Sequence, residues 1–324
     1  MDILPVPIHD YKVLIRCYTF NHSRYIEDAL NGFVRQQTNF PFVCLIVDDA
    51  STDGEQKVIK SFLDKECDMD SSEYYETDFV EIFIAHHRTN LQCTMVIYFL
   101  KENHYSINRT KRPYVDPWRD HCKYEAMCEG DDYWIDPQKL QKQVDFLESH
   151  PDYSMCFHRA QLKNEDNLYS SLHCDDIEDR TYSPDELFSK WIVPTASIVH
   201  KKEVWFVHNK GVERLLNGDI LLVLNSAKLG KIWGMSDAMS VYRIQESGVT
   251  YSKPLEKKRT MAYPAHFEFI KENYPFLNQK IVNYKLSRAF MNRRKVQHSF
   301  LGYLSDIFKA IRYYPLIVFD KFLK

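Results

Sequence analysis

The strongest constraint on the fold is an alternation of two hydrophobic periods along the first hundred residues. Short apolar runs occupy 12–18, 42–47 and 79–85, as expected of strands covered on both faces. After each of the first two runs, apolar residues recur every three to four positions, which is the spacing of an amphipathic helix. Strands that alternate with helices through short connections predict an α/β fold with a mostly parallel sheet flanked by helices.

Capping residues predict where the first helices begin. Ser23 can cap the first helix, and Thr52 and Glu55 have the spacing of a capping box for the second. Residues 93–103 are predicted to form a third helix. Residues 104–121 are polar and interrupted by prolines, so we expect a loop or insertion there.

The chain beyond residue 121 continues to alternate between strands and helices. A helix is expected to start at Asp136-Pro137, because Leu140, Val144 and Leu147 follow at helical spacing. The other expected elements are, in chain order, strands at 123–128 and 153–160, a polar loop at 164–185, a strand at 195–200, a helix near 218–229, a pair of strands near 231–244 and helices across 257–297.

Composition excludes several classes of function. Lys and Arg number 42 against 45 Asp and Glu, so the chain lacks the basic excess typical of nucleic-acid-binding proteins. It has only 9 glycines, and neither glycine-rich phosphate-binding motif occurs. No uncharged apolar run approaches the ~18 residues of a membrane span. The 8 cysteines lack zinc spacing and the N-terminus lacks a signal peptide, which predicts a cytoplasmic protein with reduced cysteines in its core.

Polar clusters follow the predicted strands at their carboxyl ends, where open α/β sheets bind ligands. The clusters are Thr19-Phe20-Asn21-His22, Asp48-Asp49 and Glu129-Gly130-Asp131-Asp132. Four aspartates from two strand ends would repel one another unless a cation or a hydrogen-bonding ligand lies among them. Carboxylate oxygens suit Mg²⁺ or Mn²⁺, and such an ion normally keeps substrate phosphates in its shell. The sequence therefore predicts a metal-linked diphosphate site.

Each cluster also has a simpler structural interpretation. An aspartate at a strand end often caps the next helix or forms an Asx-turn, which applies to Asp53, Asp136 and the pair Asp48-Asp49. The acidic run that ends at Asp132 and continues into two aromatic residues is harder to explain as a solvated turn. The histidines His22, His86, His87 and His158 are expected to be structural or exposed rather than catalytic.

Five motifs in chain order resemble those of the family 2 inverting glycosyltransferases of bacterial polysaccharide assembly. They are T-F-N-H at 19–22, V-D-D-A-S-T-D-G at 47–54, C-E-G-D-D-Y-W at 128–134, N-G-D at 217–219 and M-S-V-Y-R-I-Q-E-S-G-V at 239–249. The resemblance implies a nucleotide-diphospho-sugar transferase (GT-A) fold. It also implies a catalytic domain over 1–250, with a nucleotide-binding half at about 10–150 and an acceptor half at about 151–250. Residues 251–324 would form a helical extension.

The resemblance also assigns roles to individual residues. The implied nucleotide-sugar site consists of Tyr18, Thr19, Phe20, Asn21, Asp48, Asp49, Glu129, Asp131 and Arg243. Asp49 or its neighbour Asp48 would hydrogen-bond the base, and Asp131 and Asp132 would hold the ribose and a Mg²⁺ or Mn²⁺ ion. Asp219 would be the general base that deprotonates the acceptor hydroxyl. The implied reaction moves a hexose from a nucleoside-diphosphate sugar, with a UDP-type donor favoured, to a glycan or lipid-linked acceptor.

The chain departs from the family pattern at three positions. Gln245 stands where members commonly carry a metal- or diphosphate-binding histidine, Phe20 replaces a tyrosine, and Gln92 replaces a glycine. The first departure motivates one alternative, a non-catalytic module that binds sugar nucleotides or glycans. A second alternative is a metal-dependent phosphohydrolase that uses Asp48 and Asp49.

The last 25 residues, 300–324, are rich in apolar and aromatic side chains with interspersed lysines and an arginine. Such a segment can lie in the membrane interface, here the inner face of the cell membrane. The alternative is a terminal helix that packs on the domain or on a partner. The sequence leaves the oligomeric state open.

Overall fold

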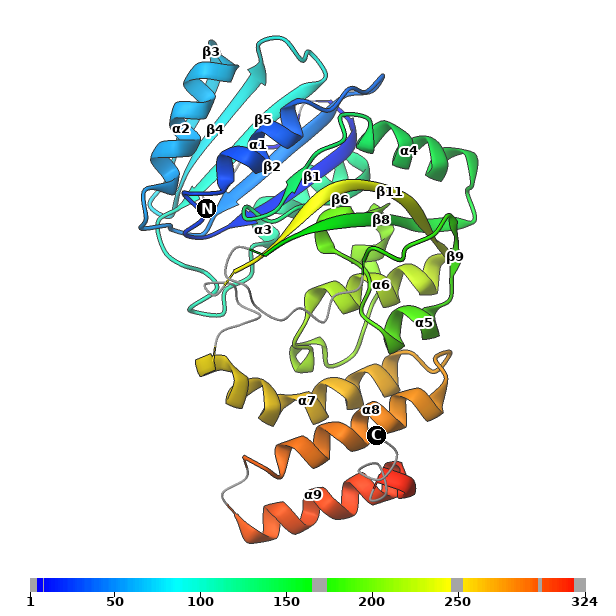
Figure 1. Ribbon diagram of the computed structural model, residues 1–324. Coiled ribbons are helices and arrows are strands. Elements are labelled where there is room, and N and C mark those ends of the chain that lie inside the picture. Colours follow the sequence, from blue (N-terminus) through cyan, green and yellow to red (C-terminus); the bar gives the residue numbers. More distant parts are fainter. Residues whose placement is uncertain (1–4, 8, 165–173, 246–252, 297–298, 318–324) are drawn as a thin grey trace. The chain divides into compact units, whose positions relative to one another are not determined.

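The computed structural model describes residues 5–7, 9–164, 174–245, 253–296 and 299–317 (Figure 1). Within these ranges the chain forms two compact units, which are not continuous in sequence. The first comprises Met1–Tyr182, Ile192–Trp205 and Leu229–Ile244, and the second comprises Ser183–Trp191, Phe206–Lys228 and Gln245–Lys324. The functional division expected at residue 250 stays a prediction.

The first unit contains one mixed sheet, with eleven strands among the described residues. Its order is β3-β4-β5-β2-β1-β6-β10-β8-β11-β7, and β9 pairs with β11. The strands are β1 (Tyr11–Thr19), β2 (Phe42–Asp48), β3 (Cys67–Glu76), β4 (Val80–His87), β5 (Cys93–Leu100), β6 (Cys122–Met127), β7 (Tyr133–Trp134), β8 (Tyr153–Asn164), β9 (Arg180–Tyr182), β10 (Val199–Lys201) and β11 (Lys231–Ile244). Its parallel centre, β5-β2-β1-β6, confirms the predicted fold class.

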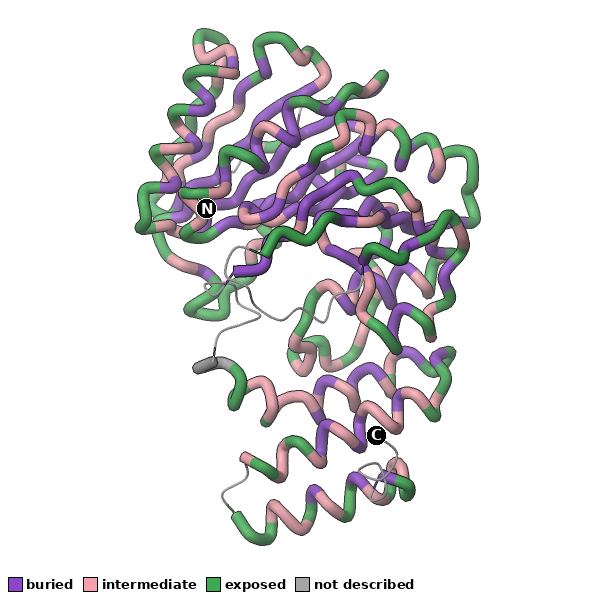
Figure 2. The backbone as a smooth tube through the Cα atoms, in the orientation of Figure 1, coloured by how far each residue is buried: buried purple, intermediate pink, exposed green. Residues whose placement is uncertain are grey.

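The central strands are buried on both faces because their alternate residues enter two separate hydrophobic cores. On β1, Val13, Ile15 and Cys17 belong to one core and Leu14 to the other. The helices of this unit are α1 (Ile26–Val34), α2 (Glu55–Glu66), α3 (Arg112–Asp120) and α4 (Lys139–Ser149). Figure 2 shows the buried strands at the centre of the unit. All eight cysteines are buried, which confirms their predicted place in the core.

The helix starts differ from the capping prediction, although α1 and α2 themselves are confirmed. α1 begins after Tyr25, and the backbone N–H of Ser23 instead donates to Asp53 (2.9 Å). α2 begins after Gly54, which has a φ of 95° and takes the left-handed conformation that glycine favours. The carboxylate of Glu55 is buried inside the protein, so it does not form a capping box with Thr52.

The segment predicted as a third helix is a strand. β5 is buried at every position and pairs in parallel with β2, with Cys93 opposite Phe42. A short apolar run does not distinguish a buried strand from a buried helix by periodicity, and this run is rich in β-branched and aromatic residues. Strand β3, which pairs with β4, was not expected, because its mostly exposed polar residues give no hydrophobic signal.

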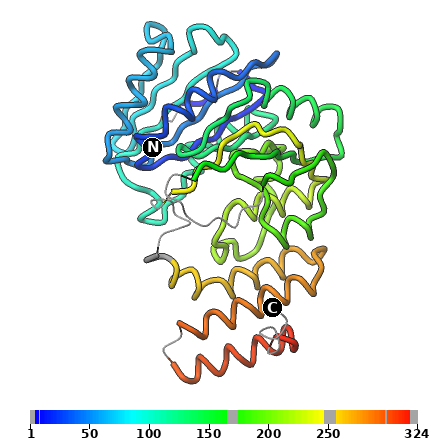
Figure 3. The backbone as a smooth tube through the Cα atoms, in the orientation of Figure 1, coloured from blue at the N-terminus to red at the C-terminus, as the bar shows by residue number. Residues whose placement is uncertain are grey.

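Three other expectations needed correction. The region 104–121 contains α3, which has a proline in its first turn, where no backbone N–H is required. The expected strand pair near 231–244 is the single strand β11, which runs beside β8 although the two are far apart in sequence (Figure 3). The expected strand at 195–200 is a 3-10 turn (Thr195–Ser197) followed by β10.

The second unit is helical. It contains α5 (Pro184–Ser189), which begins within the expected polar loop, and α6 (Gly218–Leu229), α7 (Lys253–Asn273), α8 (Gln279–Arg293) and α9 (Phe300–Tyr313). The predictions for 218–229 and 257–297 are confirmed over the described residues, while 165–173 and 318–324 lie outside them. Among the described helices, none combines the length and hydropathy that a membrane span requires.

Candidate functional site

The three predicted polar clusters meet where β1, β2 and β6 end. Thr19 lies opposite Asp48 in the parallel register. The backbone N–H of Asp49 donates to the carbonyl of Thr19 (3.0 Å), and that of Gly130 donates to the carbonyl of Tyr18 (3.2 Å). We call residues 18–22, 48–55 and 129–132 the strand-end rim. Of its side chains, those of Phe20, Asn21, Thr52 and Asp53 are exposed.

The buried side chain of Glu55 connects the loops that follow β1 and β2. Its buried carboxylate accepts hydrogen bonds from the hydroxyl of Thr19, the hydroxyl of Ser51 (2.8 Å) and the backbone N–H of His22 (2.8 Å). Burial raises the pKa of this carboxyl, although these donors act in the opposite direction. Sequence reasoning treated Glu55 only as a capping residue, because its partners on the first strand are more than thirty positions away.

Two further hydrogen bonds hold the loop after β1 against the loop after β2. The side-chain oxygen of Asn21 accepts from the N–H of Thr52 (2.8 Å), and the N–H of Asn21 donates to the hydroxyl of Ser51 (2.9 Å). Asn21 and Ala50 have positive φ values of 58° and 62°. Asparagine adopts this conformation more readily than most residues, whereas alanine rarely does. Residues 18–22 therefore have a fixed backbone.

Gly130 permits the close approach of the third cluster. A Cβ atom at this position would lie 2.1 Å from the hydroxyl oxygen of Thr19 and 3.1 Å from Nδ1 of His22. No side chain fits there without displacing the end of β1. The glycine therefore places Glu129 and Asp131 beside the residues that follow β1.

The two aspartates at the end of β2 are buried and have different hydrogen-bond partners. Asp49 accepts the backbone N–H groups of His104 (2.8 Å) and Tyr105 (3.0 Å) and pairs with Lys111 (2.8 Å). Asp48 accepts from Gln56 (2.6 Å) through Oδ1. Its other oxygen has no hydrogen-bond partner among the described residues, and burial raises the pKa of this carboxyl. The base-binding role expected for this pair stays a prediction.

Tyr18 lies against a buried charge network that the sequence analysis missed. The guanidinium of Arg16 is 4.5 Å from the ring centre, and Arg16 pairs with Glu125 (2.6 Å). Glu125 also pairs with Arg119 (2.7 Å). Burial alone would raise the pKa of Glu125, but the two guanidinium groups lower it to about 2. Charged residues within the apolar runs of two neighbouring strands were the signal that could have revealed this network.

Arg243 holds the acidic end of β6 in place. Its backbone N–H donates to Asp132 (2.8 Å), and its guanidinium donates to the carbonyl of Asp131 (2.7 Å) and pairs with Asp28. The guanidinium also lies 4.4 Å from the ring centre of Tyr133. Burial, followed by the charge of Asp131, raises the pKa of the Asp132 carboxyl well above its usual range.

The rim suits a metal ion that a substrate helps to hold. Among the described residues, no group of three or more His, Cys, Asp or Glu side chains is placed to hold an ion. Asp131 is partly exposed, and one of its oxygens is 3.9 Å from Nε2 of His22. Mg²⁺ and similar ions commonly use one or two carboxylates and complete their shell with phosphate oxygens and water. This donor set is compatible with such a site, in which Asp131 would be the accessible ligand, while Asp132 is buried.

Asp219, the predicted base, belongs to the second unit. It lies in the first turn of α6, is half-buried, and accepts the backbone N–H of Ile220 (2.8 Å). Burial raises the pKa of its carboxyl. A carboxylate with a raised pKa is a stronger base, which is the property that general-base catalysis requires.

Two solved structures share this arrangement of elements. The S. aureus protein TarS (residues 1–349, in complex with UDP-GlcNAc) has a TM-score of 0.59 and 15% identity, with 93% of this chain and 81% of that chain covered. The mannosyltransferase PcManGT of Pyrobaculum calidifontis, in complex with GDP-Man and Mn²⁺, has a TM-score of 0.50 and 15% identity, with coverages of 99% and 86%. The chain has the GT-A fold. At these identities the likeness concerns the fold alone.

Sequence relatives extend the comparison without adding a function. Uncharacterized proteins of Mycobacterium bovis and Mycobacterium tuberculosis are each 27% identical to the chain over 241 residues. The match covers 74% of this chain and 61% of each relative, so the chain spans about three-fifths of the length of these relatives. No family model matches the chain.

Proposed function

We propose that the protein is a family 2 inverting glycosyltransferase that moves a hexose from a nucleoside-diphosphate sugar to a glycan or lipid-linked acceptor in polysaccharide biosynthesis. One observation carries the proposal: in a GT-A fold, the clusters expected to bind the donor meet at the carboxyl ends of β1, β2 and β6. The similar structures hold UDP-GlcNAc in one case and GDP-Man with Mn²⁺ in the other, which supports a nucleotide-sugar donor.

The rim would bind the donor through groups that the fold has already fixed. The rings of Tyr18 and Phe20 offer surfaces on which a nucleobase can stack, and the loop that carries Asn21 has a fixed backbone. Glu129 and Asp131 would face the diphosphate side of the donor. When bound there, a Mg²⁺ or Mn²⁺ ion supplies positive charge to the leaving diphosphate. Asp131 would hold the ion, and Arg243 would keep the Asp131-Asp132 turn in position.

Asp219 would deprotonate the acceptor hydroxyl as this hydroxyl attacks the anomeric carbon. Attack from the side opposite the leaving diphosphate inverts the configuration of the sugar. The assignment rests on the N-G-D motif and on the burial that raises the pKa of the Asp219 carboxyl.

A non-catalytic sugar-nucleotide-binding protein is the second candidate. The observation that favours it is Gln245, an amide at the position of the family's histidine. A neutral amide is a weak ligand for a metal ion that activates a leaving group. The phosphohydrolase alternative has less support, because Asp48 and Asp49 are 0% and 3% exposed and an attacking carboxylate must reach its substrate.

Release of nucleoside diphosphate from nucleotide sugars with Mn²⁺ tests the proposal. The assay is run with and without oligosaccharide acceptors. Release that depends on an acceptor supports a transferase. Binding of the nucleotide sugar without release supports the non-catalytic candidate, and release of inorganic phosphate from UDP supports a phosphohydrolase. Either of the last two results overturns the proposal.

The protein would work on the cytoplasmic face of the membrane and contact it through residues 300–324. Phe300, Leu301 and Phe308 are 73%, 78% and 73% exposed, while Asp306 and Ala310 on the same helix are buried. Lys309 and Arg312 lie beside the exposed residues. Exposed aromatic and aliphatic side chains with neighbouring cations are typical of helices that bind anionic membrane surfaces.

A further inference from the structure

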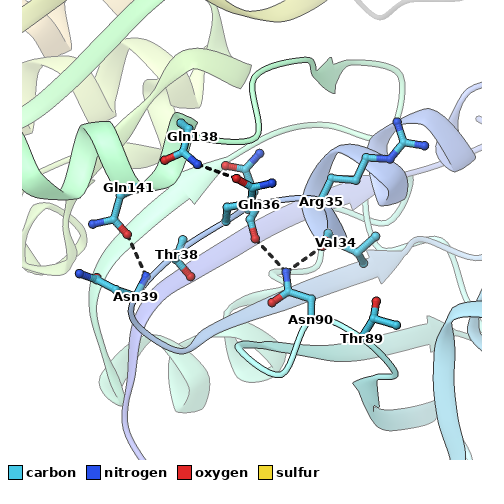
Figure 4. Close-up of a pocket in the computed structure, with 10 residues that line it drawn as sticks. Val34, Arg35, Gln36, Thr38, Asn39, Thr89, Asn90, Gln138 and Gln141 are labelled. Carbon is cyan, nitrogen blue, oxygen red and sulfur yellow. Dashed lines mark hydrogen bonds between the residues drawn. The ribbon is translucent and has the colours of Figure 1, made fainter.

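A cavity lies at the opposite edge of the parallel strands from the strand-end rim. Its walls come from the end of α1, the segment 35–39 before β2, the turn at 89–90 before β5, and the first part of α4 (Figure 4). Strand β2 runs from the cavity side at Phe42 to the rim at Asp48, a length of roughly 20 Å at the usual rise per residue of a strand. The volume of the cavity is about 720 Å³.

Primary amides dominate the lining of this cavity. They belong to Gln36, Gln37, Asn39, Asn90, Gln138 and Gln141. Thr38, Thr89 and the guanidinium of Arg35 add further polar groups, and the lining contains no carboxylate among the described residues. We call these nine residues the amide pocket. An amide side chain offers both a donor and an acceptor, so this surface can hydrogen-bond in both directions without a strong charge.

The side-chain amides of Gln36 and Asn90 fix the walls of the pocket. Gln36 is 1% exposed, donates to the carbonyl of Asp136 (2.9 Å) and accepts from the N–H of Leu140 (3.0 Å). Asn90 donates to the carbonyls of Val34 and Gln36 (2.8 Å each), as Figure 4 shows. These bonds join α1, the turn before β5 and the start of α4. The pocket is therefore formed before any ligand arrives, which reduces the entropy cost of binding.

Other groups of the pocket keep hydrogen-bonding capacity. Arg35, Gln37 and Asn39 are exposed. Gln37 accepts from Gln138 (2.7 Å) through its oxygen. Within the part of the chain that the structure describes, the guanidinium of Arg35 and the side-chain amide of Asn39 have no hydrogen bond or ion pair.

A neighbouring cavity of about 430 Å³ shares Arg35 and Gln36 with the amide pocket and is also lined by Tyr133 and Trp134. The two cavities therefore form adjoining parts of one surface. Tyr133 is partly exposed and Trp134 is 3% exposed. The lining of this neighbouring cavity also includes Asp28 and Asp136, which pair with Arg243 and Lys142.

We infer that the amide pocket is a saccharide-binding site, separate from the donor site, that takes an uncharged glycan chain. A saccharide presents many hydroxyl groups that each donate and accept, and the pocket presents amides and hydroxyls that do the same. A single guanidinium with no opposing carboxylate gives the pocket little means to select a strongly ionic ligand. A glycan that binds here and also at a second site on the protein would have a raised effective concentration at that second site.

Binding of neutral oligosaccharides without nucleotide or metal tests the inference. The full-length protein is titrated with malto-, cello- and chito-oligosaccharides, and binding is measured by saturation-transfer NMR. The test variant is Gln37→Ala with Asn39→Ala, since both side chains are exposed and the amides of Gln36 and Asn90, which fix the walls, remain. The control is Gln161→Ala, which removes an exposed amide from β8, outside the pocket.

The wild-type protein should bind at least one of these oligosaccharides. The double variant should bind it about tenfold more weakly, because two hydrogen-bonding side chains are lost, and the control should bind it normally. The inference is overturned if none of the oligosaccharides binds, or if the double variant binds as well as the wild type. No sugar nucleotide is present in the assay, so a failure here leaves the proposed transferase activity standing, and the reverse also holds.

Discussion

The two edges of the parallel strands differ in how they use polar side chains. At the carboxyl ends, acidic residues are buried and held by donors from within the protein, as Glu55 and Asp49 are. At the amino ends, neutral amides line an open cavity, and Gln36, Asn90 and Gln141 accept or donate hydrogen bonds that join its walls. Buried carboxylates at the carboxyl ends each need several hydrogen-bond donors from the protein, whereas the neutral amides at the amino ends can stay partly exposed with fewer internal hydrogen bonds.

The largest expected effect is the loss of transfer on substitution of Asp219, which lies outside the strand-end rim. Asp219→Asn should retain the melting temperature and the donor affinity, because asparagine is isosteric, but it cannot accept the proton. Transfer should fall by at least about a hundredfold, the lower range for general-base catalysis. Rates are measured as acceptor-dependent release of nucleoside diphosphate. Near-normal transfer would limit Asp219 to a structural role at the start of α6.

The next prediction tests whether the buried charges under the rim stabilise it. The pKa of Glu125 is lowered to about 2, so its contribution is complete above its usual pKa and is lost as the pH falls through about 2. The shift corresponds to about 3 kcal/mol of folding stability. The free energy of unfolding of Glu125→Gln, measured with denaturant, should therefore fall less steeply than that of the wild type as the pH decreases from about 5 to 2.

Glu148→Gln is the matched control for that measurement. The pKa of Glu148 is also lowered to about 2, by Lys123 and Lys12, but this ion pair is exposed to solvent. Screening should reduce its effect to below about 1 kcal/mol. Equal acid limbs for the two variants would contradict the stabilising role of the buried network.

A smaller effect is expected from one added methyl group at the rim. Gly130→Ala places a Cβ 2.1 Å from the hydroxyl oxygen of Thr19, so the ends of β1 and β6 must separate. Overpacking of this kind costs about 1–3 kcal/mol, and nucleotide affinity should fall with it. Gly218→Ala is the control, because its Cβ would meet open space. Thermal unfolding and UDP titration measure both effects, and equal behaviour of the variants would refute the close-approach argument.

The smallest effect concerns a region that belongs to neither edge. Deletion of 300–324 should move the protein from anionic vesicles to the supernatant in a sedimentation assay, and high salt should do so partly. Leu301→Ser should weaken vesicle binding less than the deletion, because it removes one of several exposed apolar side chains. If the full-length protein ignores vesicles, α9 serves as a packing element only.

The fold class and the rim could be predicted because their signals are local. Thr19, Asp48 and Glu129 directly follow apolar runs, and strands of a parallel sheet bring their carboxyl ends together. The third helix was predicted wrongly because burial of β5 on both faces removes the alternation that identifies a strand.

Long-range partners could not be predicted in the same way. Lys111 reaches Asp49 from a region interpreted as a loop, and Arg16 pairs with Glu125 across more than a hundred residues. The amide pocket combines segments near residues 36, 90 and 138, none of which has a distinctive motif. Such sites become visible only when the strand order is known.

Metal-linked nucleotide binding distinguishes a donor site at the strand-end rim from a purely structural cluster of carboxylates. UDP is titrated with and without Mn²⁺ into the wild type, Asp131→Asn, Asp132→Ala, and the Gln37→Ala/Asn39→Ala variant of the amide pocket. The wild type and the pocket variant should bind UDP in a Mn²⁺-dependent manner. Both aspartate variants should remain folded and lose this binding. Undiminished Mn²⁺-dependent binding by the folded aspartate variants would contradict the assignment of the strand-end rim as the donor site.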